Sequence, residues 1–225
     1  MDINNKSKKI RKRSKEGSLQ LKQDILSVAE RCFKAYGYEK TTLQMIAEEL
    51  HITQGAINYH YKNKYMVLYD LFERLYDSQF EYVNAHPPDE LNAYLLVCIA
   101  YLHAFSEVMK RQRSWELFFQ KDQFNYWVSG KRKRIEENYR NITADFHKSF
   151  TADELRAAAI TEVGAVMRLY EFFKKGDFTA EKFCYHVPYL VGVLSKLDEM
   201  TIQKDMARAY EYVDSHDMPT IFLLE

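Results

Sequence analysis

Glycine and proline are scarce in this chain, and that scarcity limits the folds it can adopt. Its 225 residues include seven glycines and four prolines, the residues that most often end helices and strands. Apolar residues recur at three- and four-residue spacing along most of the chain, as on one face of an α-helix. The hydrophobic content of 47% is sufficient for a buried core. The sequence therefore predicts an all-α protein.

The same spacing predicts a short N-terminal part followed by a longer helical part. The expected helices cover 18–36, a segment after Thr41, 54–61, 64–84, 89–110, 113–127, 131–149, 152–175, 179–196 and 199–214. We expect a basic flexible arm over 1–17, a three-helix domain over 18–64 and a larger helical domain over 65–225. Pro188 is expected to kink or divide its helix unless it is absorbed near the middle.

Charge is unevenly distributed although the formal net charge is zero. Residues 1–64 hold 13 lysines and arginines against 7 aspartates and glutamates. Seven of these basic residues lie in the arm: Lys6, Lys8, Lys9, Arg11, Lys12, Arg13 and Lys15. Such an arm is either a solubilising tail or a segment that contacts phosphates or the DNA minor groove, and its position before the next element favours DNA contact.

The segment from Thr41 to Lys64 has the pattern of a helix-turn-helix unit. Ala47 is the small residue expected where two helices cross, and Ile52 is an apolar plug in the turn. Thr41, with Gln44 three residues later, has capping-box spacing, so Thr41 is the expected N-cap. The second helix is polar except for Ile57 and Tyr61, as expected of a helix that lies in a DNA groove.

These residues resemble the DNA-binding domain of TetR-family transcriptional regulators. The resemblance rests on Phe33 to Gly37, Thr41-Thr42, Ile46-Ala47 and the run Gly-Ala-Ile-Asn-Tyr-His-Tyr-Lys-Asn-Lys over 55–64. It covers about residues 20–68. The chain departs from the commonest pattern at Asn58, Tyr61, Tyr65 and His51, the last being a turn position often held by glycine, which His can occupy with a left-handed backbone.

Roles in DNA binding follow from side-chain chemistry and from this resemblance. Gln54, Ala56 and Asn58 are candidates for base reading, since Gln or Asn can bond adenine bidentately and a methyl can meet thymine. Thr41 and Thr42 are expected to bond a phosphate at a helix N-terminus, and Tyr59 and His60 to reach phosphates. The resemblance implies that Lys64 clamps the DNA backbone. The full candidate set is Thr41, Thr42, Thr53, Gln54, Gly55, Ala56, Asn58, Tyr59, His60 and Lys64, each of which has plain surface as its alternative.

The resemblance also implies homodimerisation and a small-molecule effector. Small residues within 152–173 and 178–197 favour a dimer interface, although ordinary packing within the chain is the alternative. Aromatic residues in the middle of the chain suggest an effector pocket, and an acidic group among them would suit a cationic or aromatic ligand. The candidates are Tyr101, His103, Phe105, Glu107, Trp115, Phe119 and Trp127, with core packing as the alternative for each.

The sequence lacks the motifs that would indicate an enzyme or a metal-binding protein. No phosphate-binding loop, zinc-binding motif or nucleophile motif is present, so we expect neither an enzyme nor a metal or cofactor site. Cys32, Cys98 and Cys184 are expected to be buried thiols in a reducing cytoplasm. The apolar stretch 91–105 is too short to span a bilayer and no signal peptide is evident, so a cytoplasmic, nucleoid-associated location is expected.

Together these features predict a homodimeric DNA-binding regulator, a repressor of a palindromic operator that an effector releases. Two alternatives stay open. One is a regulator that activates or acts through a protein partner, and the other is a small-molecule-binding helical protein without DNA binding.

Overall fold

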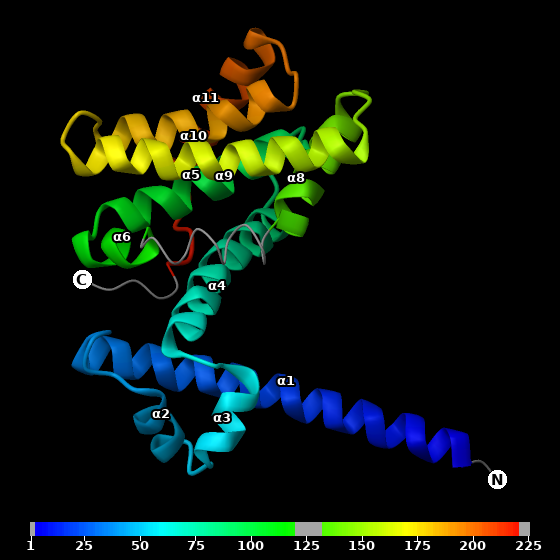
Figure 1. Cartoon of the computed structure of the whole chain (residues 1–225). Helices are drawn as coiled ribbons and strands as arrows, with labels where there is room; N and C mark the ends of the chain where they lie inside the picture. The colour runs from blue at the N-terminus through cyan, green and yellow to red at the C-terminus, as the bar shows by residue number, and fades with distance from the viewer. Residues whose placement is uncertain (1–2, 120–131, 221–225) are drawn as a thin grey trace. The chain divides into compact units, whose positions relative to one another are not determined.

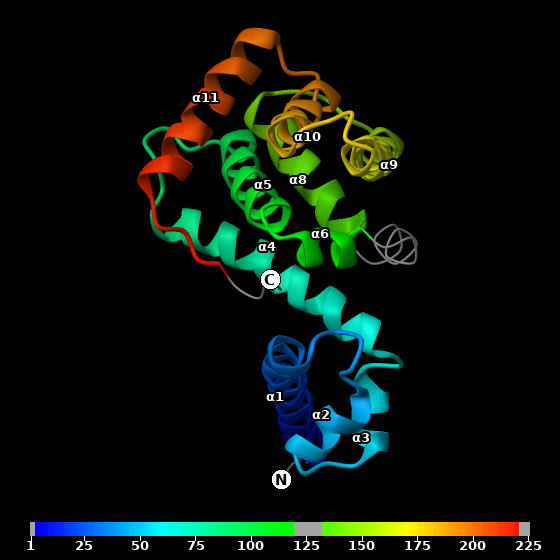
Figure 2. The same cartoon turned by 90° about the vertical axis from the view of Figure 1, so that its left-hand side faces the viewer.

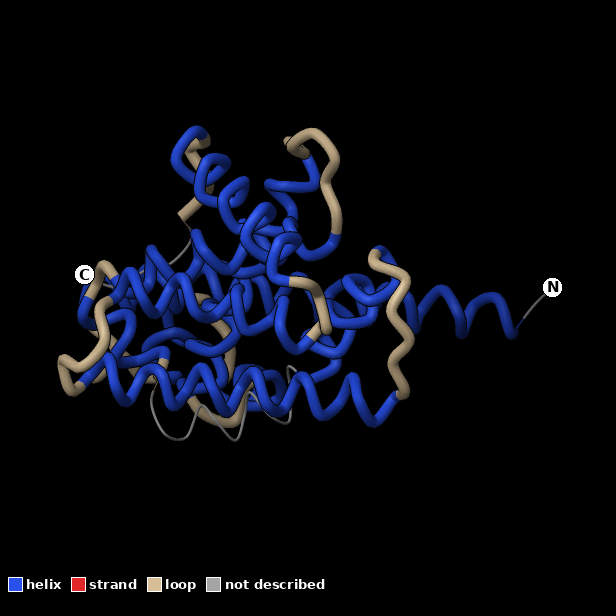
Figure 3. The backbone as a smooth tube through the Cα atoms, turned by 90° about the horizontal axis from the view of Figure 1, so that it is seen from above, coloured by secondary structure: helices blue, strands red, loops and turns tan. Residues whose placement is uncertain are grey.

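The computed structural model describes residues 3–119 and 132–220, and the side chains of 16–119 and 133–220. Within these ranges the chain forms ten helices and no strand (Figures 1 and 3), which confirms the all-α prediction. Two compact units divide between Glu73 and Arg74, and each is described by itself.

The N-terminal unit contains α1 (Ile3–Tyr36), α2 (Leu43–Glu49), α3 (Gln54–His60) and the first turns of α4 (Lys64–Ala85). The apolar stripe of α1 is buried as expected, with Ile25 and Ala29 fully enclosed and Phe33 nearly so. Helix α1 ends at Gly37, whose φ of 78° is a left-handed conformation that glycine adopts without strain.

Helix α1 begins at Ile3 and not near Ser18 as expected. The backbone of the basic segment is therefore helical in the structure, which corrects the expectation of a flexible arm over 1–17. Lys and Arg have good helix propensity and the segment contains no proline, so a helix anchored by its packed C-terminal half can extend through it.

The division between the units lies inside α4, later than the boundary expected after Lys64. The first turns of α4 are tied to the N-terminal unit through Asp70. Its carboxylate accepts a hydrogen bond from the Tyr61 hydroxyl at 2.8 Å and pairs with Lys22 at 2.7 Å. These contacts explain why the N-terminal unit includes the start of this helix.

The second unit is built around α5 (Ala93–Met109), which buries 14 of its 17 residues. A helix that is apolar on all sides must be enclosed by others. Figure 2 shows α8 (Arg132–Asp145), α10 (Ala180–Leu194) and α11 (Glu199–Ser215) around it, and all three pack against it. The remaining helices of the unit are α6 (Gln112–Phe118) and α9 (Ala152–Lys174).

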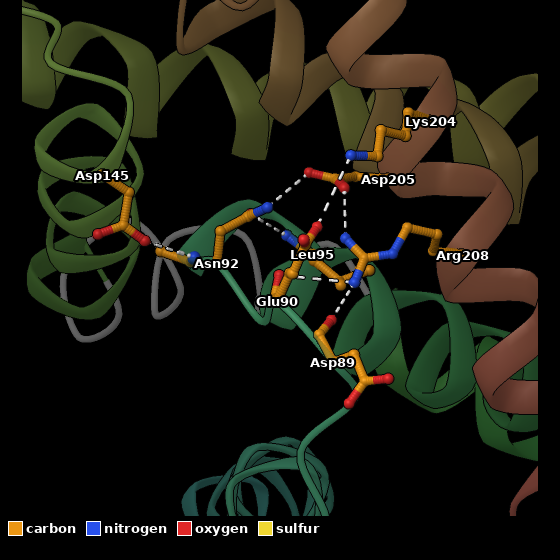
Figure 4. Close-up of polar contacts among 9 residues, drawn as sticks. Asp89, Glu90, Asn92, Leu95, Asp145, Lys204, Asp205 and Arg208 are labelled. Carbon is orange, nitrogen blue, oxygen red and sulfur yellow. Dashed lines mark hydrogen bonds and ion pairs between the residues drawn. The ribbon is translucent and has the colours of Figure 1, made fainter.

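A polar network fixes the start of α5 at Ala93, later than the expected residue 89 (Figure 4). The Asn92 side chain accepts a hydrogen bond from the Leu95 amide and donates one to buried Asp205, both at 2.8 Å. Arg208 pairs with the same carboxylate at 3.1 Å and also donates to the Asp89 carbonyl. Asn92 is therefore the N-cap of α5. Its side chain bonds a backbone amide of the first turn, which has no partner within the helix.

Two other helix ends differ from expectation, and Pro188 takes one of the two places expected of it. Helix α6 ends at Phe118, and the rest of the expected helix over 113–127 lies largely outside the described residues. Helix α8 ends at Asp145, short of residue 149, because His147 adopts a φ of 53°. Pro188 is absorbed within α10, which is continuous from Ala180 to Leu194.

No single helix in the described part of the chain is long and apolar enough to cross a membrane. Helices α5 and α6 meet the requirements of length and composition only as a pair, with a bend of 115° between them.

Candidate nucleic-acid interface and effector cavity

The helix-turn-helix is held together by a small apolar framework. Ile46 and Ile57 are fully buried, Tyr61 is 1% exposed and Ala47 is 3% exposed. The turn carries the positive φ expected of it, 53° at His51. Thr53 caps α3, its hydroxyl accepting a hydrogen bond from the Ala56 amide at 3.2 Å. The framework therefore fixes the two short helices without using the polar face of α3.

That polar face is presented to solvent. Asn58 is exposed, and the Tyr59 ring is 82% exposed and packs edge-on against His60. Gln54 donates a hydrogen bond to the Asn58 carbonyl oxygen at 3.1 Å, so the two candidate base-reading amides are coupled. A Cβ built at Gly55 would meet only the Thr53 hydroxyl, at 3.8 Å. Packing within the chain therefore does not require glycine at this position.

Thr41 is not positioned as expected. Thr42, not Thr41, is the N-cap of α2 and accepts a hydrogen bond from the Met45 amide at 3.2 Å. Thr41 is fully buried, and its hydroxyl is shared between the carbonyls of Cys32 at 3.1 Å and Gly37 at 2.9 Å. Its side chain is enclosed by the chain and closes the end of α1.

Lys64, expected to clamp a phosphate, is bonded to the backbone of the chain in this structure. Its ammonium donates to the carbonyls of Tyr38 at 2.6 Å and of Glu39 and Thr41 at 3.0 Å, which uses all three of its donors. It also lies 4.4 Å from the centre of the Tyr38 ring. Burial lowers its pKa, and the Glu39 charge opposes that shift.

Two of the candidate effector residues, Tyr101 and Phe105, line a cavity in the second unit. Its lining also includes Tyr76, Phe80, Arg134, Ile135, Glu162, Val163 and Val166. The cavity is small, about 20 Å³ in volume, which is room for roughly one water molecule.

The other candidate effector residues in the described part of the chain are not among the lining of this cavity. Glu107 pairs with Lys110 and with Arg111 at 2.9 Å, and these partners help lower its pKa against the opposing effect of burial. The neighbouring His103 is buried, which lowers its pKa. Because its charge is neutralised within the chain, Glu107 is not an available partner for a cationic ligand.

The aromatic candidates outside the cavity serve as packing. Phe119 stacks on Tyr170 with ring centres 4.2 Å apart, and Trp115 packs against Tyr170 and Phe173. Trp127 lies outside the described residues.

Glu162 is the acidic residue of this lining, and it is not among the candidates named from the sequence. It is 3% exposed, and burial raises its pKa to about 7, partly offset by the hydroxyls of Tyr139 and Tyr101. A signal was present in the sequence. Glu162 shares one helix face with the buried residues Ala158, Ala159, Val163 and Val166, where a charge is costly without a partner or a function.

The fold and the exposed α3 define a helix-turn-helix protein with a separate helical domain, and comparisons identify its family. Residues 25–71 match the family model described as "Bacterial regulatory proteins, tetR family". The chain is 28% identical over 144 residues to the probable HTH-type transcriptional regulator ArpR of Pseudomonas putida. It is 27% identical over 135 residues to the HTH-type transcriptional regulator AcrR of Shigella flexneri.

These alignments cover 62% and 58% of this chain, and 67% and 61% of the two relatives. Among solved structures, the ligand-free structure of RolR is similar in fold, with a TM-score of 0.54 and 15% identity over 89% of this chain and 99% of that one. The N-terminal helix-turn-helix domain is thus of the TetR family of bacterial regulatory proteins, and the chain is similar to transcriptional regulators of that family. The relatives are regulators and not enzymes.

Proposed function

We propose that the protein binds a palindromic operator as a homodimer and represses transcription until a small molecule bound in the second unit releases it. The observation that carries this proposal is the polar, outward-facing α3 on a buried apolar framework in a TetR-family domain. The framework residues Ile57 and Tyr61 hold α3 in place, while Asn58 and Tyr59 are exposed and Gln54 is half-buried.

Base reading is best assigned to Gln54 and Asn58. Each side chain ends in an amide, a group whose donor and acceptor can bond the major-groove edge of adenine. Their mutual hydrogen bond restrains both side chains before DNA arrives, which lowers the entropy lost on binding. Ala56 and Gly55 supply little bulk, so the helix backbone can approach the bases closely.

The effector-release part of the proposal is supported by the aromatic cavity in the second unit. An effector can shift the DNA-binding equilibrium only by binding one conformation more tightly than the other. The cavity is smaller than an organic ligand, so the ligand-bound conformation must be more open, and this difference provides such a preference.

The proposal is tested by measuring DNA binding of the full chain by fluorescence anisotropy. Bound sequences selected from a random DNA pool should contain two half-sites about one helical turn apart, or a multiple of this distance. Binding should weaken steeply with salt because phosphate contacts release counterions. Failure to enrich any duplex, or binding that is insensitive to salt, would contradict DNA binding.

Gln54→Ala should relax specificity at one base pair per half-site, by about 1–3 kcal/mol. The matched control is Gln44→Ala on α2, since Gln44 donates to Glu48 four residues later at 2.7 Å, just as Gln54 donates to Asn58. The control should leave the sequence preference unchanged. A uniform loss of affinity for all sequences from Gln54→Ala would contradict the base-reading role.

A further inference from the structure

The cavity of the second unit combines three aromatic rings with one buried carboxyl group. Tyr76, Tyr101 and Phe105 pack edge to face in a closed triangle, with ring centres 5.8–5.9 Å apart. Glu162 lies on the same lining, contributed by α9. Aromatic rings beside a carboxylate form a favourable environment for a positive charge, because both ring faces and carboxylate oxygens carry negative potential.

The charged groups around Glu162 leave it without a cation in the described part of the chain. Arg134 of α8 is the basic residue of the lining, but it pairs with Asp77 at 2.6 Å and stacks over the Phe80 ring at 5.0 Å. The groups that interact with the Glu162 carboxyl are the neutral hydroxyls of Tyr139 and Tyr101. Arg134 is thus engaged by Asp77 and Phe80, while the carboxyl of Glu162 is bonded by tyrosine hydroxyls.

We propose that this cavity, in the more open ligand-bound conformation that its small size requires, recognises an organic cation, with Glu162 as its counter-ion and the rings of Tyr76, Tyr101 and Phe105 beside the charged group. This inference rests on the proposed effector-released function and names the chemical class of its ligand. Glu107, the acidic residue favoured by sequence reasoning, is excluded from this role by its ion pairs with Lys110 and Arg111.

Binding of a cation at this site should release a proton from Glu162. Burial raises the pKa of Glu162 to about 7, so we expect a sizeable share of the molecules to carry a proton on this carboxyl at neutral pH. A bound cation stabilises the ionised form, and the proton leaves to solvent. Affinity for a permanently charged cation should therefore rise as the pH increases towards 7 and level off above it.

The test uses three probes of similar size with the full chain: phenyltrimethylammonium, its neutral isostere tert-butylbenzene, and anionic benzenesulfonate. Isothermal titration calorimetry in two buffers of different ionisation enthalpy gives both the affinity and the number of protons released. The cation should bind most tightly, with release of about half a proton at pH 7. Tighter binding of the neutral or anionic probe, or no binding of the cation, would overturn the proposal.

Glu162→Gln should weaken binding of phenyltrimethylammonium about 10- to 100-fold and abolish proton release, with little effect on tert-butylbenzene. Glu171→Gln, an exposed glutamate of the same helix, is the matched control and should change neither. Tyr139→Phe keeps the carboxyl but removes a hydroxyl that favours its ionised form. It should move the midpoint of the affinity–pH curve to higher pH, and an unchanged midpoint would count against Glu162 as the titrating group.

DNA binding is measured in parallel without a probe, so that a failure of cation binding can be distinguished from a failure of the proposed DNA-binding function. A chain that binds its selected duplex but ignores the cation refutes this inference alone. A chain that binds the cation but no duplex refutes the proposed function instead.

Discussion

Lys64 ties the segment between α1 and α2 to the start of α4 through three carbonyl oxygens. Lys64→Met, which keeps most of the aliphatic chain, should therefore lower the free energy of unfolding by about 1–3 kcal/mol, since hydrogen bonds to charged groups are lost. Urea unfolding followed by far-UV circular dichroism measures this change. The dependence of DNA affinity on salt should keep its slope, because no donor of Lys64 is available to a phosphate.

Lys62→Met is the matched control for that variant. Lys62 is exposed two residues earlier, so stability should change by less than about 0.5 kcal/mol. A salt slope reduced by about one with unchanged stability in Lys64→Met would restore the phosphate-clamp role.

Glu162 gives the folded chain a pH dependence of its own. Its pKa is raised from 4.5 to about 7 by burial, so the folded state binds the proton more tightly than the unfolded state. This contribution to stability is complete below pH 4.5 and is lost as the pH rises to about 7. Between pH 5.5 and 8 the wild type should lose about 2 kcal/mol more than Glu162→Gln in urea unfolding. Equal losses in the two proteins would show that Glu162 titrates normally.

Side-chain direction is where sequence reasoning was least informative. Ile57 and Tyr61 were identifiable as core residues from their four-residue spacing, and both are buried. Thr41 and Lys64 were placed at the DNA, yet both bond backbone carbonyls of the chain around the end of α1. Those carbonyls are brought near by the folding of the segment after Gly37, and no local pattern in the sequence specifies that path.

At the scale of helices, two glycines of the second unit differ sharply in their surroundings. A Cβ at Gly192 of α10 would lie 2.6 Å from the Tyr94 hydroxyl and 2.8 Å from Ile202, where α10 crosses α5 and α11. A Cβ at Gly164 of α9 would meet nothing within 4 Å. Gly192→Ala should therefore destabilise the fold by about 1–3 kcal/mol through overpacking.

Gly164→Ala is the matched substitution, and it should stabilise the isolated chain by about 0.5–1 kcal/mol because alanine favours a helix. Both effects are measured by urea unfolding at nanomolar protein concentration. A loss of stability in Gly164→Ala that appears only at higher concentration would place this position against a second copy of the chain.

Helix boundaries followed the sequence pattern where capping residues were present and departed from it elsewhere. Helix α9 begins at Ala152 as expected because Thr151 and Glu154 form a capping box. Helix α5 begins late because Asn92 is held by Asp205, a residue 113 positions away. Such a contact depends on the folded arrangement of α11, so periodicity could not predict it.

For the whole molecule, one helix-turn-helix reads only a short half-site, so the proposed operator requires two copies of the chain. Helices α9 and α10 pack against each other (Figure 1) and carry apolar residues on their outer faces. Ile160 on α9 is 46% exposed and Val193 on α10 is 47% exposed. On α9, Ala157, Gly164 and Met167 lie on the same face as Ile160, within the segment expected to dimerise.

Ile160→Glu should therefore convert a dimer into a monomer at micromolar concentration, as measured by light scattering after size exclusion. A two-fold interface contains every substitution twice, so one change places two carboxylates in an apolar contact. Met200→Glu is the control, because Met200 is 82% exposed on α11 outside this face, and it should leave the dimer intact. The monomeric variant should also lose affinity for a two-half-site duplex while retaining its weaker affinity for a single half-site. A wild type that is monomeric, or an Ile160→Glu variant that stays dimeric, would remove α9 from the proposed interface.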